Sequence, residues 1–401
     1  GLGGFLFSVY AWVVMKLKPK SIHQVNLRFH KAVSKLMKSV LYTNPFVVKE
    51  IRNPNKETFE KPAIMIANHT SFLDILCMGM LKPKTIFLVN DWVYNSPVFG
   101  NAAKLVGAYP VSGGIENGEE YLKEKVDQGF SLIAFPEGTR STSNKINRFY
   151  KGAFYLAEQF NLDILPILIH GNSEVLPKGS FVIRDGSITL EVLHRITPED
   201  TTHGENYTKQ GKGVGAYFRN EFRRLRDEIE NETYWHKTIL EHYRYKGETI
   251  YKAVRKDLQK NASVYKSILR AIGEKENVVH ISDDYGQLDL LLALDSIDRK
   301  IDTFLTDPNA KAILKNSFLT HQYSKITVFD TQTDTLSKAA NVLLLNTNID
   351  SKNLAKNLKS EITTLILFKS GLEINLQEVL SLNFSVHVQN DNFIILIRKI
   401  N

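Results

Sequence analysis

The sequence holds a single cysteine, Cys77, and no run of residues that amounts to a complete membrane span. One thiol cannot form an intrachain disulfide, which agrees with a reducing, cytoplasmic setting. The uncharged stretch 2–15 falls short of the roughly 20 apolar residues that a full crossing requires. With 43% hydrophobic and 23% charged residues, the 401-residue chain is too polar for a multi-span membrane protein. It is long enough for two domains.

Acidic residues are missing from the first 49 positions, and Glu50 is the first of them. A basic arm of this kind suits either an anionic membrane surface or nucleic acid. The apolar stretch 2–15, followed directly by lysines, favours the cytoplasmic side of a membrane and speaks against nucleic acid. The stretch 2–15 fits either the end of a transmembrane helix or an interfacial anchor. The basic residues of the arm are Lys16, Lys18, Lys20, Arg28, Lys31, Lys35 and Lys38.

Residues 22–41 show helical spacing of apolar residues flanked by bases, which predicts an amphipathic helix. Two placements remain open for it. The helix lies in the lipid head-group region, or it packs on the following domain with its lysines in water. Because the chain begins with Gly1 rather than Met, we expect a processed product or a segment of a longer protein.

The remaining chain predicts two α/β domains joined by helices. We divide the sequence into a membrane-associated helical segment (1–43), an α/β domain (44–204), a helical connector (205–274) and a second, doubly wound α/β domain (275–401). In the first domain the expected strands are 46–51, 63–67, 85–89, 131–135 and 164–170, the expected helices 71–81, 115–128 and 148–160, and 181–193 a hairpin around Asp185-Gly186. In the second, strands are expected within 277–282, 300–306, 325–330, 341–347 and 362–368, followed by a hairpin within 384–400.

A polar cluster, Asn68-His69-Thr70-Ser71-Phe72-Leu73-Asp74, follows the apolar strand 63–67. Such a cluster lies at the carboxyl edge of the sheet, where ligand crevices form. An imidazole can remove a proton from an attacking hydroxyl, and a carboxylate can fix its tautomer. His69 and Asp74 can meet only if His69 precedes the helix and Asp74 lies inside it. The alternative interpretation is structural, with Asp74 bonding backbone amides in a capping arrangement.

A second polar segment, Glu137-Gly138-Thr139-Arg140, follows the strand 131–135. Gly138 allows a tight turn, and Arg140 is suited to bidentate bonds with phosphate or carboxylate. Together, NHTSFLD at 68–74 and FPEGTRS at 135–141 resemble the lysophospholipid, or 1-acylglycerol-3-phosphate, acyltransferase family. The glycine-containing block 106–111 and the proline-containing strand 165–167 occur in the family's order. The resemblance covers roughly residues 44–200.

This resemblance implies that His69 is the general base and Asp74 its orienting carboxylate. It implies that the acceptor's head group is bound by Glu137, Gly138, Thr139 and Arg140, with Lys151 adding positive charge. The acyl donor would be a thioester of acyl-carrier protein or coenzyme A, with no metal and no bound cofactor. One departure concerns the second block, because 108–113 has no basic residue and the nearest is Lys104. The acceptor is therefore left open between lysophosphatidate and an N-acylated 3-hydroxy amino acid.

Residues 277–401 resemble a class I methyltransferase domain in strand order and final hairpin. The family's first loop is rich in glycine, because the backbone must approach S-adenosylmethionine closely. Here that loop, 280–286, keeps only Gly286, and the two acids Asp283 and Asp284 stand in the turn. We expect a degenerate domain that does not bind the cofactor. We interpret the two acids as solvated turn residues rather than metal ligands.

The sequence as a whole predicts a membrane-associated O-acyltransferase at the cytoplasmic face of the inner membrane, acting in phospholipid or aminolipid biosynthesis. The acceptor is a membrane lipid with one acyl chain, and no nucleic acid partner is expected. The rival hypothesis is a non-catalytic membrane scaffold that binds acyl-carrier protein or lipid. A His69→Ala variant separates the two, because only an enzyme loses turnover.

Overall fold

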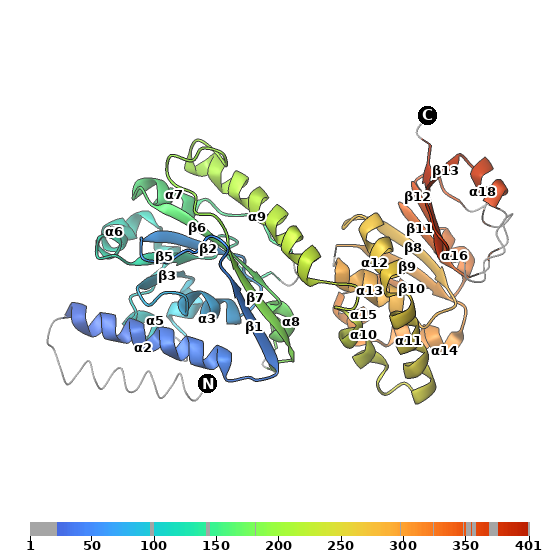
Figure 1. Ribbon diagram of the computed structural model, residues 1–401, viewed down its shortest axis with the longest axis horizontal. Helices are drawn as coiled ribbons and strands as arrows, with labels where there is room; N and C mark the ends of the chain where they lie inside the picture. Colours follow the sequence, from blue (N-terminus) through green and yellow to red (C-terminus); the bar gives the residue numbers. More distant parts are fainter. Residues whose placement is uncertain are drawn as a thin grey trace. The chain divides into compact units, whose positions relative to one another are not determined.

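The computed structural model describes residues 22–96, 100–141, 145–180, 182–296, 298–323, 325–347, 349, 354, 358–368 and 376–399. It divides into two compact units, Gly1–Arg226 and Asp227–Asn401 (Figure 1). Each unit is built around a seven-stranded sheet with helices, so the predicted α/β class is confirmed. The apolar stretch 2–15 lies outside the described residues. Among the helices that are described, none has the length and apolar character needed to cross a bilayer.

The sheet of the first unit has the strand order β1-β7-β6-β2-β5-β3-β4. Neighbouring strands run parallel except β6 and β7, which are antiparallel. The mixed or parallel sheet expected from the sequence is therefore present. Its strands are β1 Val47–Arg52, β2 Ala63–Ala67, β3 Thr85–Val89, β4 Tyr109–Pro110, β5 Ser131–Ala134, β6 Asp163–His170 and β7 Gly186–Val192.

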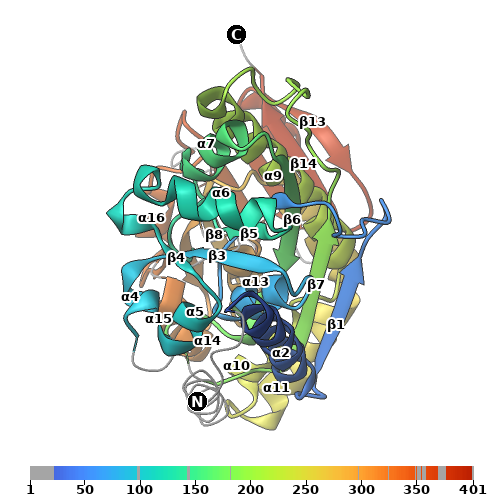
Figure 2. The same ribbon diagram turned by 90° about the vertical axis from the view of Figure 1, so that its left-hand side faces the viewer.

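The central strands of this sheet are covered on both faces. Every residue of β2, β5 and β6 is buried, as continuous apolar runs in a parallel sheet require. Helices α2 and α5 lie on one side of the sheet, and α6, α7 and α9 on the other (Figures 1 and 2). The helices are α2 Ile22–Tyr42, α3 Leu73–Gly79, α4 Asp91–Tyr94, α5 Gly100–Leu105, α6 Glu119–Asp127, α7 Gly152–Gln159, α8 Asn172–Val175 and α9 Tyr207–Ile229, with 3-10 turns at Val111–Gly113 and Glu116–Gly118.

The hairpin predicted within 181–193 is wrong. Strand β7 begins at Gly186, but its partners are β6 and β1 rather than the residues before the turn. The amide of Arg184 donates to the carbonyl of Val175 instead, at 2.8 Å. The segment before the turn is therefore held by helix α8, although the Asp185-Gly186 pair is typical of hairpin turns.

Helix α2 confirms the amphipathic helix expected near residues 22–41, and it packs on the first unit. Phe29 and Leu41 are buried, and Met37 packs against the core cluster around β2 and α3. The sulfur of Met37 lies where a side chain at Gly79 would be. The bases Arg28, Lys31, Lys35 and Lys38 are exposed. The helix therefore packs its apolar stripe on the domain and leaves its positive charges available to an anionic surface.

The second unit has the strand order β10-β9-β8-β11-β12-β14-β13. The first five strands are parallel, and β14 runs antiparallel to both β12 and β13. This is the doubly wound sheet closed by a hairpin that the sequence predicted. Its strands are β8 Asn277–Ser282, β9 Lys300–Leu305, β10 Ile326–Val328, β11 Val342–Asn346, β12 Thr364–Phe368, β13 Phe384–Gln389 and β14 Phe393–Arg398.

Strand residues of this sheet alternate between two apolar clusters, one on each face. Val278 and Leu344 belong to the first cluster, and their chain neighbours Val279 and Leu343 belong to the second. This alternation follows from the two-residue period of a strand. The helices are α10 His236–Tyr243, α11 Glu248–Lys260, α12 Ala262–Ala271, α13 Gln287–Asp295, α14 Pro308–Lys315, α15 Phe318–Tyr323, α16 Gln332–Leu336 and α18 Leu376–Ser381.

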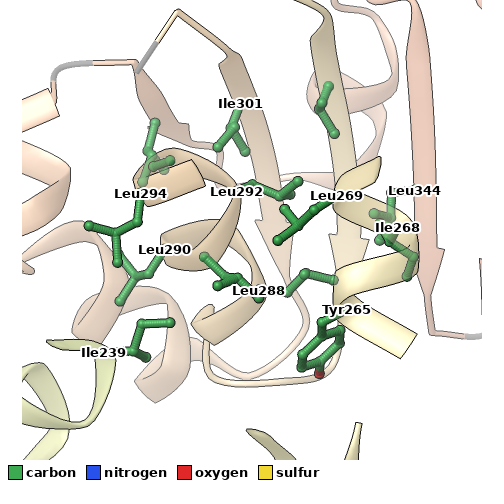
Figure 3. Packing of buried hydrophobic residues seen from close by; sticks show 14 of the residues in the cluster. Ile239, Tyr265, Ile268, Leu269, Leu288, Leu290, Leu292, Leu294, Ile301 and Leu344 are labelled. Carbon is green, nitrogen blue, oxygen red and sulfur yellow. The ribbon is translucent and has the colours of Figure 1, made fainter. Parts of the chain in front are cut away.

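Helix α13 fills the centre of the first of these clusters. Its residues 287–294 are all buried, so the helix has no solvent face, as its nearly continuous apolar sequence requires. Figure 3 shows its leucines, including Leu288 and Leu292, among Tyr265, Ile268 and Leu269 of α12 and Ile301 of β9. The region expected to connect the domains is thus divided. Most of α9 lies in the first unit, and α10 to α12 contribute to the core of the second.

Candidate active site

The polar segment after β2 forms the candidate site. His69 lies in the turn that precedes α3, and Asp74 lies in the first turn of that helix. This placement brings His69 Nδ1 to 2.8 Å from Asp74 Oδ2. The contact between the two side chains, which the sequence allowed only for such a turn, is present.

The Asp74 carboxylate is fully buried and surrounded by donors. Besides the imidazole, its Oδ2 accepts the amides of Thr70 and Ser71 at 2.7 and 2.8 Å. Its Oδ1 accepts the side-chain amide of Asn172 at 2.6 Å. The capping bonds and the contact with the ring occur together, because one carboxylate accepts from the turn's amides and faces the imidazole. Four donors suit an ionised carboxylate, which only accepts.

The His69 ring is fixed on a second side by Phe135, the residue that directly follows β5. The two rings are stacked with centroids 4.1 Å apart and an angle of 18° between their planes. The imidazole side chain is 14% exposed and lines a cavity. Since Nδ1 faces a carboxylate, the ring's proton is assigned to Nδ1, and Nε2 is left to accept a proton.

The second polar segment holds the backbone of His69 from both sides. Glu137 Oε1 accepts the amide of His69 at 2.7 Å, and the amide of Ser141 donates to the His69 carbonyl, also at 2.7 Å. Glu137 Oε2 accepts the amide of Asn147 at 2.8 Å. Burial raises the pKa of the Glu137 carboxyl to about 7, although both amide bonds oppose the rise. Glu137 therefore acts on the position of His69, a role that the resemblance did not imply.

A cavity of about 420 Å³ opens beside the imidazole. Its wall is mostly apolar and aromatic, as is usual for cavities that bind small molecules. Apolar and aromatic residues that line it include Phe72, Ile75, Phe87, Leu88, Val89, Trp92, Val93, Val111, Ile115, Phe135 and Tyr150.

The predicted head-group residues divide between the cavity and its surroundings. Gly138, Thr139 and Arg140 line the cavity, whereas Glu137 and Lys151 are not among its lining residues. Glu137 is 3% exposed and turned to backbone amides, and the Lys151 ammonium lies 5.7 Å from the centre of the Tyr207 ring.

Gly138 makes the turn that carries this segment past the cavity. Its φ of 70° lies in the left-handed region, which side chains other than glycine rarely adopt. A Cβ there would also meet the Tyr150 ring at 3.0 Å. The carbonyl of Gly138 accepts the side-chain amide of Asn90 at 3.0 Å. The turn thus has both a conformational and a steric reason for glycine.

Two residues of the site, Asn172 and Lys178, were not predicted from the sequence. Asn172 lies two residues after the end of β6, a strand parallel to its neighbour β2, so the rule applied to Asn68 and His69 would have found it. Lys178 lines the cavity from the loop between α8 and β7. Nothing in the spacing of that loop marks it, because only the fold brings the loop beside Arg140.

The block at 108–113, which has no basic residue, brings no positive charge to the cavity wall. Val111 and Ile115 from this region line the cavity with apolar side chains. Lys104, the nearest base, does not line the cavity, and its ammonium lies 5.1 Å from the centre of the Tyr94 ring.

A second pair of histidine and aspartate lies in the other unit. His280 Nδ1, on β8, is 2.9 Å from Asp289 Oδ1, on α13, and both side chains are fully buried. The carboxylates Asp289, Asp284 and Asp283 raise the pKa of His280 against the effect of its burial. Across the part of the chain that is described, no group of His, Cys, Asp and Glu side chains is arranged to hold a metal ion.

The loop after β8 differs in part from its interpretation. Asp283 is exposed, as expected for a turn residue. Asp284 is half-buried, and its Oδ1 accepts the amide of Gly286 at 2.8 Å. Desolvation raises the pKa of the Asp284 carboxyl to about 7. The interpretation of Asp284 as a solvated residue is therefore wrong, because its carboxyl faces inward and accepts a hydrogen bond from the backbone of the turn.

Comparisons with known proteins match part of the chain to one family by sequence. The sequence model of the Acyltransferase family matches residues 47–170. A chloroplastic 1-acyl-sn-glycerol-3-phosphate acyltransferase of Brassica napus is 30% identical over 174 residues, covering 42% of this chain and 50% of that protein. The chain thus spans about half the length of the curated relatives it matches.

Two solved structures resemble parts of the chain. The 1-acyl-sn-glycerophosphate acyltransferase PlsC of Thermotoga maritima covers 55% of this chain and 89% of its own, with 20% identity and a TM-score of 0.47. A putative caffeoyl-CoA O-methyltransferase of Staphylococcus aureus covers 41% of this chain and 98% of its own, with 12% identity and a TM-score of 0.29. Likeness at this level says nothing about chemistry.

Proposed function

We propose that the first unit, whose residues 47–170 match the sequence model of the Acyltransferase family, transfers a fatty acyl group from a thioester to the hydroxyl of a mono-acylated lipid. One observation carries the proposal. The His69 imidazole is held on Nδ1 by the buried Asp74 carboxylate while it lines a largely apolar cavity. A base of this kind beside a space suited to an acyl chain supports acyl transfer to a hydroxyl.

The reaction follows from these positions. Nε2 of His69 takes the proton of the acceptor hydroxyl as its oxygen attacks the thioester carbonyl carbon. Asp74 Oδ2 stabilises the imidazolium that forms, and Phe135 keeps the ring in plane. The tetrahedral intermediate collapses with loss of the thiolate, which takes the proton from the imidazolium. The products are an ester and a thiol, and His69 returns to its neutral form.

The donor and the place of the reaction are part of the proposal. The donor is a thioester of acyl-carrier protein or of coenzyme A. The chain acts at the cytoplasmic face of the inner membrane, where the exposed bases Arg28, Lys31, Lys35 and Lys38 of α2 meet anionic lipid. The uncharged stretch 2–15 supports this placement.

We further propose that the second unit does not bind S-adenosylmethionine. The loop after β8 is where such a fold would hold the cofactor. There the amide of Gly286 is already bonded by Asp284 Oδ1, and a Leu314 methyl group lies 2.8 Å from where a Cβ at Gly286 would be. These contacts leave the turn bonded to its own chain and support the absence of cofactor binding. We propose an assembly or regulatory role for this unit.

The test is an acyl-transfer assay of the purified chain in phospholipid vesicles, read by mass spectrometry of the lipid products. Acyl-carrier-protein and coenzyme A thioesters are each paired with 1-acylglycerol-3-phosphate and with an N-acylated 3-hydroxy amino acid. We expect a diacylated product from at least one pair and a kcat lowered by about 10²–10⁴-fold in His69→Ala.

The matched control is His194→Ala, which removes an exposed histidine outside the cavity and should leave kcat unchanged. Product formation that survives in His69→Ala would contradict the assigned mechanism. Absence of product from the wild-type chain with all four pairs would favour the scaffold hypothesis.

A further inference from the structure

Two cations from distant parts of the sequence lie at the same cavity. Arg140 belongs to the turn after β5, and Lys178 belongs to the loop between α8 and β7, beyond the residues matched by the family. The Lys178 ammonium donates a hydrogen bond to the carbonyl of Arg140 at 2.9 Å. This bond ties the ammonium to the turn that carries the guanidinium.

Within the described structure, no aspartate or glutamate lines the cavity beside this pair of cations. The carboxyls of Asp74 and Glu137 bond the imidazole and backbone amides instead. In the described parts of the chain, neither Arg140 nor Lys178 forms an ion pair. Two uncompensated positive charges beside an apolar wall attract an anion strongly.

The guanidinium of Arg140 also contacts an aromatic ring. It lies 6.0 Å from the centre of the Trp92 ring, within the range of a cation–π contact. Trp92 itself lines the cavity and is 57% exposed. A planar guanidinium held in this way offers two parallel donors, and the ammonium adds a point charge beside it.

We propose that Lys178 and Arg140 together bind a phosphomonoester on the acceptor lipid, so that Lys178 supplies the positive charge that the block at 108–113 lacks. This inference rests on the proposed acyl transfer. A phosphomonoester carries a charge of about −1.5 to −2 at neutral pH, whereas a carboxylate carries a single charge. Two cations match the first and exceed the second, so Lys178 sets a preference for phosphorylated acceptors.

Steady-state kinetics of the full chain in vesicles test this role, with Lys178→Gln, Lys178→Arg and the control Lys123→Gln. Lys123 is a partly exposed helical lysine paired with Asp127 and is not among the residues that line the cavity, so its variant removes the same charge at another place. For 1-acylglycerol-3-phosphate we expect Lys178→Gln to raise KM by about tenfold with kcat nearly unchanged. Lys178→Arg should restore most of the affinity, and Lys123→Gln should match the wild type.

Two further measurements separate the inference from its alternatives. The KM for the acyl donor should stay constant, because a rise there in place of the acceptor effect would assign the cations to the phosphates of coenzyme A. The second measurement is the binding of 1-acylglycerol-3-phosphate to the His69→Ala variant and to the His69→Ala, Lys178→Gln double variant, both in vesicles. It reports the head-group contact without turnover. Weaker binding in the double variant supports the inference even if no turnover is found.

Other results would overturn it. Equal losses of kcat for phosphorylated and carboxylate acceptors would mean that Lys178 only supports the backbone of Arg140. An unchanged acceptor KM in Lys178→Gln, with turnover still dependent on His69, would leave the acyltransferase proposal standing and remove Lys178 from the site. Inorganic phosphate that competes equally with both acceptors would show an anion site without lipid selectivity.

Discussion

The two units each hold a histidine bonded through Nδ1 to an aspartate, at 2.8 Å for His69–Asp74 and 2.9 Å for His280–Asp289. The pairs differ in everything that surrounds this bond. The His69 side chain is 14% exposed and lines a cavity, whereas both partners of the second pair are fully buried. An imidazole beside a carboxylate is therefore no sign of catalysis by itself, because access for a substrate separates the two cases.

The partners of the carboxylates differ as well. Every donor that Asp74 needs is present, from the ring, two backbone amides and Asn172. By contrast, Asp289 Oδ2 and His280 Nε2 are buried and have no hydrogen-bond partner within the described structure. The Asp74 carboxylate accepts hydrogen bonds on both oxygens next to an opening, whereas the second pair keeps unsatisfied polar atoms inside a core.

Replacing the carboxylate of each pair should give the largest contrast. Asp74→Asn keeps the volume but loses an acceptor that the ring needs, so we expect kcat to fall by about 10³–10⁴-fold. Asp289→Asn should leave kcat unchanged and lower the free energy of unfolding of the second unit by about 1–3 kcal/mol. Acyl-transfer kinetics and hydrogen exchange of peptides from each unit measure the two effects. An equal loss of turnover in both variants would erase the distinction.

Glu137 sharpens the comparison, because the second pair has no carboxylate clamp of this kind on the backbone of its histidine in the described residues. Glu137→Gln retains one acceptor oxygen for two backbone amides, so the His69 turn should loosen. We expect kcat to fall by about 10–100-fold with KM for the acceptor little changed, as for a displaced catalytic group. A rise in KM at constant kcat would instead restore Glu137 to the head-group role implied by the resemblance.

The pH dependence of stability tests the buried acid of the second unit. The pKa of Asp284 is raised from 3.8 to about 7, so the folded unit binds more protons than the unfolded chain between these values. Its stability should therefore fall as pH rises from about 4 to 7. The raised pKa of His280 acts in the same direction above pH 6.5.

Asp284→Asn should flatten this decline over the acidic part of the range, measured by hydrogen exchange in the second unit at several pH values. The wild-type first unit serves as an internal reference, although Glu137 gives it a decline of its own up to about pH 7. Unchanged pH profiles in Asp284→Asn would show that this carboxyl titrates normally.

Lys151 should give the smallest effect. Its ammonium lies over the Tyr207 ring and outside the cavity lining, so Lys151→Gln removes a surface charge only. We expect acceptor KM to change by less than about twofold, since exposed charges act weakly through water. A KM increase comparable to that of Lys178→Gln would place Lys151 at the head group after all.

The sequence predicted the elements that consist of continuous apolar runs. The predicted bounds of 63–67 and 85–89 coincide with β2 and β3, because strands inside a parallel sheet consist mainly of apolar residues. It failed at residues 181–193, where a turn signal was present but the partner strand was decided by β6 and β1. Local turn chemistry specifies a bend and not which strand lies beside it.

The candidate site likewise combines contacts that local sequence predicts with contacts that only the fold decides. His69 and Asp74 are close in sequence, so strand-to-helix geometry alone restricts how they meet. Asn172 and Lys178 reach the site from about a hundred residues further along the chain. Glu137 was recognised as part of a motif, yet its direction, toward the amide of His69 and away from the cavity, follows from the packing of two strand ends.

The order of residues along the chain determined the two sheets, the class of the fold and the imidazole–carboxylate pair, since these depend on short-range periodicity and on a turn of a few residues. Which histidine faces a cavity and which is sealed in a core was decided by the tertiary structure. So was the meeting of Lys178 with Arg140. Burial and charge balance are properties of surfaces assembled from distant segments, and no local pattern records them.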